Sequence, residues 1–541
     1  MPTVHNVLKN PDLITVINDN GTLEKNFSQI GENFNGTKVI YQSQGEKDIL
    51  LIESVVPVKF LKLRWKTSFP KDSIYLADDW ERGYGTLGFQ KITPNRIMPW
   101  YFLMSTSNEK IGYGVMVQPN AMCFWQVDPI GLTLIIDVRN GGNGVELGNR
   151  RLPVCEIISR KYENVSSFEA AKNFCKAMCP NPIFPQQPVY GSNNWYYAYG
   201  DSSSENIIND AKYLSSLTYN NNNEPFMVID DGWQQNHKID NYNGGPWFKG
   251  NSRFPDMKGL ANLISSYDVK PGIWVRLLQN ESEEIPNSWR NPINNNLDPS
   301  NPEALEYIKE DLKRLCGWGY RLIKHDFSTF DLFNKWGFEM NPLVTENGWN
   351  FYDHSLTSAE IVKKLYKAIL KVANQYDALI LGCNTIGHLG AGLMHLNRVG
   401  DDTSGKEWER TRQIGINSLA FRLPQDQAFF SIDADCVGIT GHIDWYFNKQ
   451  WAQLIEKSGT SLFISIKPNI LNNQQKIELT QIMERASKQE QHFIPMDWEQ
   501  IDCPQIWSDG KRTHKFDWFE QNGIKFNSRT SRYLSFLSII P

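Results

Sequence analysis

Acidic residues recur where short apolar segments end in the middle of this sequence. In chain order they are Asp230 and Asp231, Asp326, Asp401 and Asp402, and Asp433 and Asp435. Like charges that converge destabilise a fold unless a ligand or a reaction uses them. Two converging carboxyl groups can divide acid–base and nucleophilic chemistry between them. One protonates a leaving oxygen, and the other attacks carbon or activates water.

The segment Lys324-His325-Asp326 contains the best candidate for a nucleophile. Side chains alternate along a strand, so Lys324 and Asp326 face one side and His325 the other. With Asp326 in a site, the Lys324 charge would keep its carboxylate ionised. The alternative is a buried ion pair that serves only the fold. The position among other strand-end acids favours the catalytic interpretation, and His325 is expected to pack against surrounding helices.

The pair Asp401 and Asp402 is the candidate source of the second catalytic carboxyl group. One of the two is expected to cap the following helix, and spacing does not decide which is catalytic. Asp230, Asp231 and Trp195 suit sugar binding, because carboxylates accept hydrogen bonds from hydroxyls while an indole covers the apolar face of a sugar ring. A calcium or magnesium cluster is the less favoured use of these acids. We expect no metal, since the chain has 9 His and no HxH or HExxH spacing.

These acids must be positioned by short apolar strands that alternate with amphipathic helices. The predicted strands cover residues 190–195, 225–229, 271–275, 321–324, 378–381, 396–399, 429–432 and 461–464. Eight strands, each followed by helical sequence, predict an α/β fold of the (β/α)8 TIM-barrel type. A doubly wound sheet is the competitor, but it usually carries a Gly-rich phosphate loop, which this sequence lacks. In such barrels the active site lies at the C-terminal ends of the strands.

One helix of this region is predicted in detail, over residues 303–317. Its apolar residues share one face and are Leu305, Ile308, Leu312 and Leu315. Ser300 and Glu303 fit a capping box, and Pro302 falls in the first turn, so these residues predict where the helix begins.

The chain is predicted to be multidomain, with three regions. They are an antiparallel β-sandwich domain (1–180), the barrel (181–470) and a small β-rich C-terminal domain (471–541). A Pro-rich segment links the first two regions. The last region opens with a helical run over 475–489 and contains a hairpin that turns at Asp509-Gly510.

Composition argues against two classes of partner. A net charge of -5 leaves no basic surplus to neutralise phosphates, so no nucleic acid is expected. No segment approaches a membrane-spanning length without charges or Gly/Pro breaks, so no membrane is expected. The first residues lack a basic region followed by an apolar run, and the 8 Cys form no CxxC pair. We therefore expect a cytoplasmic protein with reduced thiols.

The sequence resembles glycoside hydrolase clan D, and most closely the melibiase-like family 36 of α-galactosidases and α-N-acetylgalactosaminidases. The segments that carry the resemblance span roughly 190–440 in the expected order. They are Phe226-Met-Val-Ile-Asp-Asp-Gly-Trp-Gln, Phe254-Pro-Asp-Met-Lys-Gly-Leu-Ala, Lys270-Pro-Gly-Ile-Trp, Leu322-Ile-Lys-His-Asp-Phe, Arg398-Val-Gly-Asp-Asp-Thr and Ile432-Asp-Ala-Asp-Cys-Val-Gly. The motif strand departs from many members by carrying His325 in place of Trp or Leu.

The resemblance implies a role for each matching residue. In that family the Asp of the Lys-x-Asp motif is the nucleophile, and the acid/base Asp lies four residues after an Arg of the sixth strand. This implies Asp326 as nucleophile and selects Asp402 over Asp401. The implied substrate contacts are Asp230, Asp231, Trp274, Lys324 and Arg398, with Cys383 and Asn384 in the loop that meets the sugar C2 substituent. The segment 79–85 resembles a loop that reaches over the active site, which implies Trp80 as a contact; a sandwich-core tryptophan is the alternative.

The implied activity is that of a retaining exo-glycoside hydrolase. It would release terminal α-linked galactose or N-acetylgalactosamine by double displacement, without a cofactor. Asn384 and Gly387 are modest in size and leave the two sugars about equally favoured. Two alternatives are a transglycosylating α-galactosyltransferase of the raffinose-synthase type and a non-catalytic carbohydrate-binding barrel. The expected partner is a small oligosaccharide or glycoconjugate, and a homo-oligomer is left open.

Overall fold

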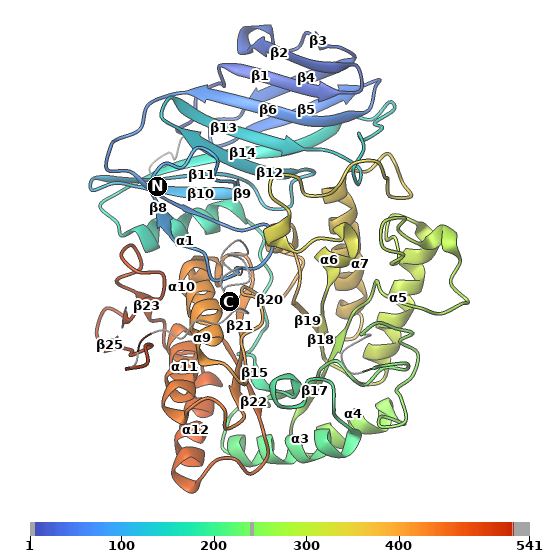
Figure 1. Cartoon of the computed structure of the whole chain (residues 1–541), viewed down its shortest axis with the longest axis vertical. Coiled ribbons are helices and arrows are strands. Elements are labelled where there is room, and N and C mark those ends of the chain that lie inside the picture. The colour runs from blue at the N-terminus through green and yellow to red at the C-terminus, as the bar shows by residue number, and fades with distance from the viewer. Residues whose placement is uncertain (1–5, 239–242, 522, 524–541) are drawn as a thin grey trace, which may run out of the picture.

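The computed structural model describes residues 6–238, 243–521 and 523. Figure 1 shows an antiparallel β-structure, coloured blue to cyan, stacked above a ring of helices that surrounds a second set of strands. The chain passes from the upper part to the lower part once, after helix α1 (Ser167–Met178). The N-terminal β-structure therefore covers one end of the barrel that follows it.

The N-terminal part consists of two antiparallel sheets, which confirms the predicted sandwich. The first has the order β2-β1-β6-β13-β12-β9, with bounds β1 (Leu13–Asn18), β2 (Gly21–Asn26), β6 (Val58–Lys66), β9 (Met98–Pro99), β12 (Met122–Asp128) and β13 (Gly131–Asp137). The second has the order β3-β4-β5-β14-β11-β10-β7-β8, with bounds β3 (Asn33–Phe34), β4 (Thr37–Ser43), β5 (Asp48–Ser54), β7 (Ile74–Ala77), β8 (Phe89–Gln90), β10 (Tyr101–Ser105), β11 (Glu109–Val115) and β14 (Leu152–Glu163). In β5 buried and partly exposed residues alternate, as in a strand with one face on a core.

Parallel strands form a closed barrel in the described part of the chain, and each pairs with its neighbours in sequence. They are β15 (Tyr190–Asn193), β16 (Phe226–Ile229), β17 (Lys270–Val275), β18 (Leu322–His325), β19 (Leu379–Gly382), β20 (Leu396–Arg398), β21 (Ser431–Ile439) and β22 (Ser461–Ile466). Pairing of β15 with β22 closes the ring. The (β/α)8 prediction is confirmed, because a doubly wound sheet would leave two open edges.

Helices follow the strands and surround the barrel. They are α2 (Trp195–Ala198), α3 (Ser204–Thr218), α4 (Met257–Ser265), α5 (Pro302–Gly317), α6 (Ser328–Phe333), α7 (Ser358–Asn374), α8 (Gly387–Gly390), α9 (Trp408–Arg410), α10 (Asn417–Arg422), α11 (Trp445–Ser458) and α12 (Asn473–Ala486). A π-helical turn, Thr411–Ile416, joins α9 to α10. Helix α12, at the start of the region predicted as a C-terminal domain, packs against α11 and α3 beside the barrel.

The start of α5 differs from the prediction. The N-cap is Asn301, whose side chain accepts hydrogen bonds from the backbone N–H groups of Glu303 and Ala304. The prediction of a capping box between Ser300 and Glu303 is therefore wrong, while Pro302 does lie in the first turn as predicted. Asparagine caps as well as serine does, and Ser300 is instead occupied by accepting a bond from the backbone of the α6–α7 connection.

Strand β21 is longer than its apolar run predicts. The prediction ends at residue 432, so that Asp433 and Asp435 follow the strand, whereas the strand continues to Ile439 and contains both acids. A buried strand tolerates these carboxylates because Arg398 pairs with both of them. The register shifts between Asp433 and Cys436, and Asp435 has a φ of 74°, so the strand bulges where the acids lie.

The last described residues form a small sheet of β23 (Ile494–Pro495), β24 (Ile506–Ser508) and β25 (Thr513–Lys515). Strands β24 and β25 pair antiparallel, and Gly510 between them has a φ of 83°. This confirms the predicted hairpin at Asp509-Gly510, because that turn needs a residue tolerant of positive φ. Residues 524–541 of the predicted C-terminal domain lie outside the described residues.

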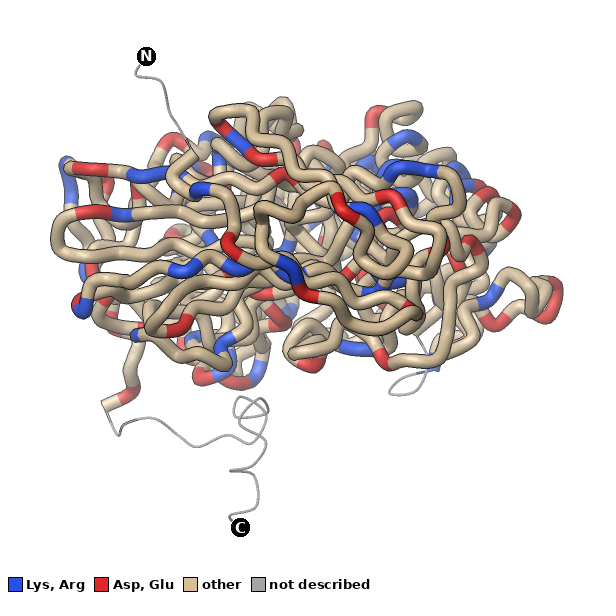
Figure 2. Tube along the Cα trace, turned by 90° about the horizontal axis from the view of Figure 1, so that it is seen from above, with Lys and Arg blue, Asp and Glu red and all other residues tan. Residues whose placement is uncertain are grey.

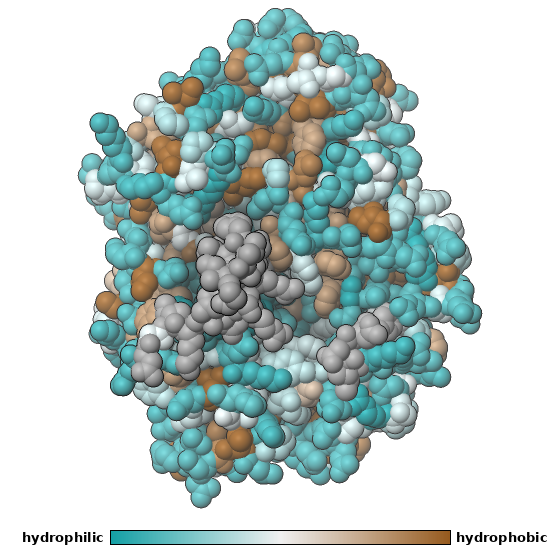
Figure 3. Space-filling view, viewed as in Figure 1, coloured by the Kyte–Doolittle hydropathy of each residue, from teal (hydrophilic) through white to brown (hydrophobic). Residues whose placement is uncertain are grey.

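Charged residues of both signs are interspersed along the chain in Figure 2. The face drawn in Figure 3 is mainly hydrophilic, with smaller hydrophobic areas scattered among polar residues. Within the described ranges, no helix combines the length and apolar character that crossing a bilayer requires.

The contact between the sandwich and the barrel includes Trp80, whose side chain is completely enclosed. Its ring meets Trp100 and Phe124 edge-on at 5.3 and 5.9 Å between centroids. Its indole N–H donates to the side chain of Asn341, in the connection after α6, at 2.8 Å. Trp80 therefore belongs to the sandwich core and ties it to the barrel.

Replacing Trp80 with Ala is expected to lower the free energy of unfolding by roughly 3–5 kcal/mol, since a large buried ring and a buried hydrogen bond are both lost. Denaturant unfolding followed by intrinsic fluorescence and circular dichroism measures the change. Tyr219→Ala is the control, because Tyr219 is 74% exposed and its loss should change stability by about 0.5 kcal/mol or less. Equal effects of the two substitutions would contradict the role given to Trp80.

Candidate active site

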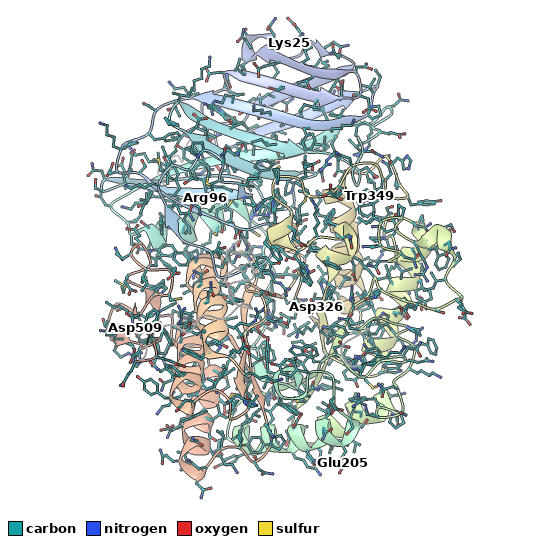
Figure 4. The ribbon with its side chains drawn as sticks, viewed as in Figure 1. Lys25, Arg96, Glu205, Asp326, Trp349 and Asp509 are labelled. Atoms are coloured by element: carbon teal, nitrogen blue, oxygen red, sulfur yellow. The ribbon has the colours of Figure 1, made fainter. Side chains whose placement is uncertain are left out.

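A cavity of about 250 Å³ lies at the C-terminal ends of the barrel strands. Figure 4 shows Asp326 near the centre of the molecule, below the sandwich and at the end of β18. The cavity is lined by eight of the eleven residues predicted for the site, namely Trp195, Asp230, Asp231, Trp274, Lys324, Asp326, Arg398 and Asp402. The closed barrel thus brings together residues that lie up to 207 positions apart in the sequence (402 − 195).

Asp326 is held by two hydrogen-bond donors. The indole N–H of Trp274 donates to its Oδ2 at 3.1 Å, and the backbone N–H of Phe327 donates to its Oδ1 at 2.7 Å. Phe327 has a φ of 60°, a left-handed conformation that residues other than Gly seldom adopt. That turn folds the next amide back onto the carboxylate, so the carboxylate has a fixed orientation.

Burial acts to raise the pKa of Asp326, but the positive charges of Arg82 and Lys324 outweigh it. With the hydrogen bonds from Trp274 and Phe327, they hold the pKa below its usual range. The carboxylate is therefore ionised at neutral pH, as a nucleophile requires.

Asp401 and Asp402 have different surroundings. Asp401 pairs with Arg82 and with Arg410, at 2.9 Å in each case, and its side chain is 9% exposed. Asp402 contacts Arg398 at 3.2 Å, and its side chain is 43% exposed. The expectation that one of the two caps the following helix is wrong, since the N-cap position of α9 is Glu407. Both residues line the cavity, and Asp402 is the more accessible of the two.

Burial raises the pKa of Asp402, and the negative charges of Asp401 and Asp435 act in the same direction. Arg398 and Arg82 oppose this without reversing it. Among the carboxyl groups that line the cavity, Asp326 and Asp402 therefore have pKa values shifted in opposite directions, a pattern that separates a nucleophile or base from an acid.

Arg398 balances the acids on the β20–β21 side of the cavity. Its Nη1 lies 3.2 Å from Asp402, its Nε 3.2 Å from Asp433, and its Nη2 2.7 Å from Asp435. Asp435 also accepts a hydrogen bond from Tyr196. One guanidinium thus compensates three carboxylates, which explains how so many acids are buried together.

Lys324 pairs with Asp230 at 2.7 Å, and both side chains are buried. Asp230 also accepts from the side-chain amide of Asn193 at 2.5 Å, and its other oxygen accepts the backbone N–H of Asp231 at 2.9 Å. Asp231 accepts from Gln234 at 2.6 Å. The adjacent acids after β16 are therefore fixed by protein donors while both still line the cavity.

Aromatic side chains complete the cavity walls. Trp195 and Tyr199 follow β15, with ring centroids 5.5 Å apart. Trp336 and Phe338 come from the connection after α6, and Tyr84 of the sandwich meets Phe338 at 5.0 Å. Apolar ring faces beside oriented carboxylates are typical of a site for a sugar, whose own faces are apolar and whose edge carries hydroxyls.

Three predicted residues do not line the cavity. Trp80 lies in the sandwich core, Cys383 is buried at the end of β19, and Asn384 is fully buried with its amide donating to Glu81. The Asn384 side chain, which was expected to meet the sugar, instead contacts Glu81 of the sandwich loop. A contact of this kind, between residues 303 positions apart, cannot be predicted from a single sequence.

Sequence reasoning missed Arg82, which lines the cavity and carries the largest favourable charge effect on Asp326. It lies two positions after Trp80, in a segment already singled out for another residue. An arginine next to an acid in that segment was the available signal. Trp336 and Phe338 lie in a connection without any motif, and nothing in the sequence distinguishes them from core aromatics.

Among the described residues, no group of three or more His, Cys, Asp or Glu is arranged to hold a metal ion. The acids of the cavity are instead engaged by Lys324, Arg82, Arg398 and Arg410.

Comparison with solved structures identifies the fold. The α-galactosidase of Thermus thermophilus, solved with p-nitrophenyl α-D-galactopyranoside, superimposes with a TM-score of 0.59 at 16% identity, over 88% of this chain and 99% of that one. The family 36 α-galactosidase AgaA of Geobacillus stearothermophilus gives 0.59 at 14% identity, over 87% and 70%. The galactosidase domain of the α-galactosidase–sucrose kinase AgaSK gives 0.60 at 14% identity, over 94% and 79%.

The chain therefore has a multidomain fold in which a sandwich is followed by a closed barrel. This architecture is the one found in the α-galactosidases named above. No family model matches the sequence, and no curated protein matches it either.

Glu81, in the sandwich loop beside the cavity, gives a test of this interface. Its side chain accepts hydrogen bonds from Asn384 and from the backbone N–H of Gly337, and it is fully buried. Burial raises its pKa to about 7, despite the opposing charge of Arg82. A carboxyl group whose pKa is raised in the folded state binds more protons there than in the unfolded state, so its contribution to stability is lost as pH rises towards 7.

We therefore expect Glu81→Gln to make stability less dependent on pH between about 4.5 and 7, because the amide cannot ionise. Thermal unfolding of both proteins across this range measures the difference between their pH profiles. Glu499→Gln, at a position outside the cavity lining, is the control. Parallel pH profiles for wild type and Glu81→Gln would contradict the buried, proton-binding state of Glu81.

Proposed function

We propose that the protein is a retaining exo-α-galactosidase. The observation that carries the proposal is the pair Asp326 and Asp402, which face one cavity with pKa values shifted in opposite directions. A binding module has no need of two carboxyl groups with pKa values shifted in opposite directions in the same cavity, so this pair favours catalysis over the non-catalytic alternative.

In the first step of the proposed mechanism, Asp402 donates its proton to the glycosidic oxygen while a carboxylate oxygen of Asp326 attacks the anomeric carbon. The bond to the leaving group breaks, and a covalent glycosyl-enzyme ester forms. In the second step, Asp402, now ionised, removes a proton from water, which attacks the same carbon and releases Asp326. Two inversions give net retention, and no cofactor takes part.

The cavity favours a single terminal sugar ring. Its volume is about 250 Å³, and its polar groups cluster on Asp230, Asp231 and Lys324, which suit adjacent hydroxyls. Galactose is the proposed sugar because the solved neighbours include an α-galactosidase bound to an α-galactoside. The alternatives are N-acetylgalactosamine as the sugar, and transfer to an acceptor sugar in place of hydrolysis.

Aryl α-glycosides test the reaction and the sugar together. We expect turnover of p-nitrophenyl α-galactoside above that of the N-acetylgalactosaminide, with the α-anomer of galactose as the first product in proton NMR. An initial β-anomer would contradict the retaining mechanism. Inactivity on every aryl α-glycoside by a folded protein would favour the binding alternative, and a trisaccharide product formed with added sucrose would favour transfer.

Asp326→Ala should lose at least about a thousandfold in kcat, since no covalent intermediate can form. Added azide should then restore turnover of an activated aryl galactoside and give the β-galactosyl azide, because azide attacks from the side that Asp326 vacates. Asp311→Ala is the matched control, since Asp311 is a buried aspartate in α5, outside the cavity lining. Absence of rescue in Asp326→Ala, with the fold intact, would overturn the nucleophile assignment.

The pH dependence follows from the two pKa shifts. Activity requires Asp326 ionised and Asp402 protonated, so kcat/KM should fall below the pKa of Asp326 and above that of Asp402. The acid limb is expected below the usual aspartate value of about 3.9, and the basic limb above it. Asp402→Ala, assayed with an activated leaving group that needs no proton, should lose the basic limb. Persistence of that limb in the variant would show that another group is the acid.

A further inference from the structure

Two residues of the sandwich, Arg82 and Tyr84, reach the cavity between residues of the barrel. They belong to the loop that follows β7, in which Trp80 is anchored in the sandwich core. Arg82 is 5% exposed, and its guanidinium lies over the ring of Trp336 at 5.4 Å. A charged side chain from a separate part of the fold is thus placed among the catalytic candidates.

The backbone next to Arg82 is fixed to the end of β20. The N–H of Gly83 donates to the carbonyl of Val399 at 2.7 Å, and the N–H of Asp401 donates to the carbonyl of Gly83 at 2.9 Å. A Cβ atom at position 83 would come within 2.7 Å of the Ser418 hydroxyl, so any residue other than glycine would force Ser418 to shift. The loop therefore pairs like a short strand directly beside Asp401 and Asp402.

The guanidinium of Arg82 contacts the acids of that segment unequally. Its Nη2 lies 2.9 Å from Asp401 and its Nη1 3.9 Å from Asp402. Asp401 is also paired with Arg410 at 2.9 Å. Asp401 therefore has two arginine partners for one negative charge. The positive charge of Arg82 is only partly balanced by Asp401, so it also acts on the other groups of the cavity.

We propose that Arg82 is a positioning residue that lets the sandwich set the charge states of the two catalytic carboxyl groups in the barrel. The proposal rests on the proposed function of Asp326 and Asp402. Among the neighbouring charges, Arg82 lowers the pKa of Asp326 the most, and it also lowers the pKa of Asp402. Its loss should make both carboxyl groups harder to ionise.

Charges from every neighbouring element act on these groups. Those facing Arg82 are Glu81 in its own loop and Asp401 and Asp402 after β20, while the thiol of Cys383 after β19 is neutral because burial raises its pKa. Asp326 also faces Lys324 of β18, and Asp402 faces Arg398 of β20 and Asp435 of β21. None of these groups is removed in an Arg82 variant, so a shift of both pH limbs in the same direction is the specific consequence of removing this cation.

Arg82→Met tests the proposal through the pH profile of kcat/KM on p-nitrophenyl α-galactoside. Both limbs should move to higher pH by about one unit, which is a tenfold fall in rate on the acid limb. Arg82→Lys should restore most of the shift, because it keeps the charge while losing the planar fork. The control is Arg139→Met, which removes a buried arginine that pairs with Asp137 and bonds to the β-barrel connection at Thr345. It should lower stability without moving either limb.

An Arg82→Met profile that coincides with wild type, or a general loss of rate without a shift, would overturn the proposal. A second measurement does not depend on turnover, so it separates this proposal from the proposed function. In a double-mutant cycle of unfolding free energies, Arg82→Met should destabilise less when Asp326 is already Asn, because the favourable charge interaction is gone. Additive effects in that cycle would overturn the proposal even if the enzyme is active, and coupling would support it even if no substrate is turned over.

Discussion

The structure depends on the compensation of carboxylates that a closed barrel forces together. Parallel strands deliver their C-terminal ends to one face, and here four of them end in or carry aspartates. Buried acids that repel one another would open this face without positive partners. Arg398 supplies the centre of that compensation with its three acidic contacts, and Lys324 does the same for Asp230 on the other side.

Compensation is uneven, and the unevenness produces the chemistry. At Asp326, the nearby positive charges and hydrogen-bond donors lower the pKa by more than burial raises it. At Asp402, burial and the neighbouring acids prevail, and the pKa is raised. Two side chains of the same type thereby acquire opposite tendencies to hold a proton. Asp401, between two arginines, shows the third outcome, a carboxylate committed to the structure.

The sandwich takes part in this arrangement and is more than an added domain. Trp80 fixes its loop in the sandwich core, Gly83 pairs that loop with the end of β20, and Arg82 projects into the cavity. Glu81 holds Asn384 on the outer side of the same wall. Stability of the interface and the electrostatics of the site therefore rest on one short segment.

Local sequence patterns were enough to predict the barrel, the sandwich and the strand-end acids of the cavity. Apolar runs ending in acids mark strand ends, and strand ends of a barrel must converge, so Asp230, Asp326 and the pair Asp401 and Asp402 were found without coordinates. The choice of Asp402 within that pair came from the family resemblance. Tertiary structure alone decided the partners. Which aspartate meets an arginine, which strand continues past its apolar run, and whether Asn384 faces a sugar or the sandwich all depend on contacts between distant segments. Charge compensation acts through space, and a linear pattern carries no record of the distances that set it.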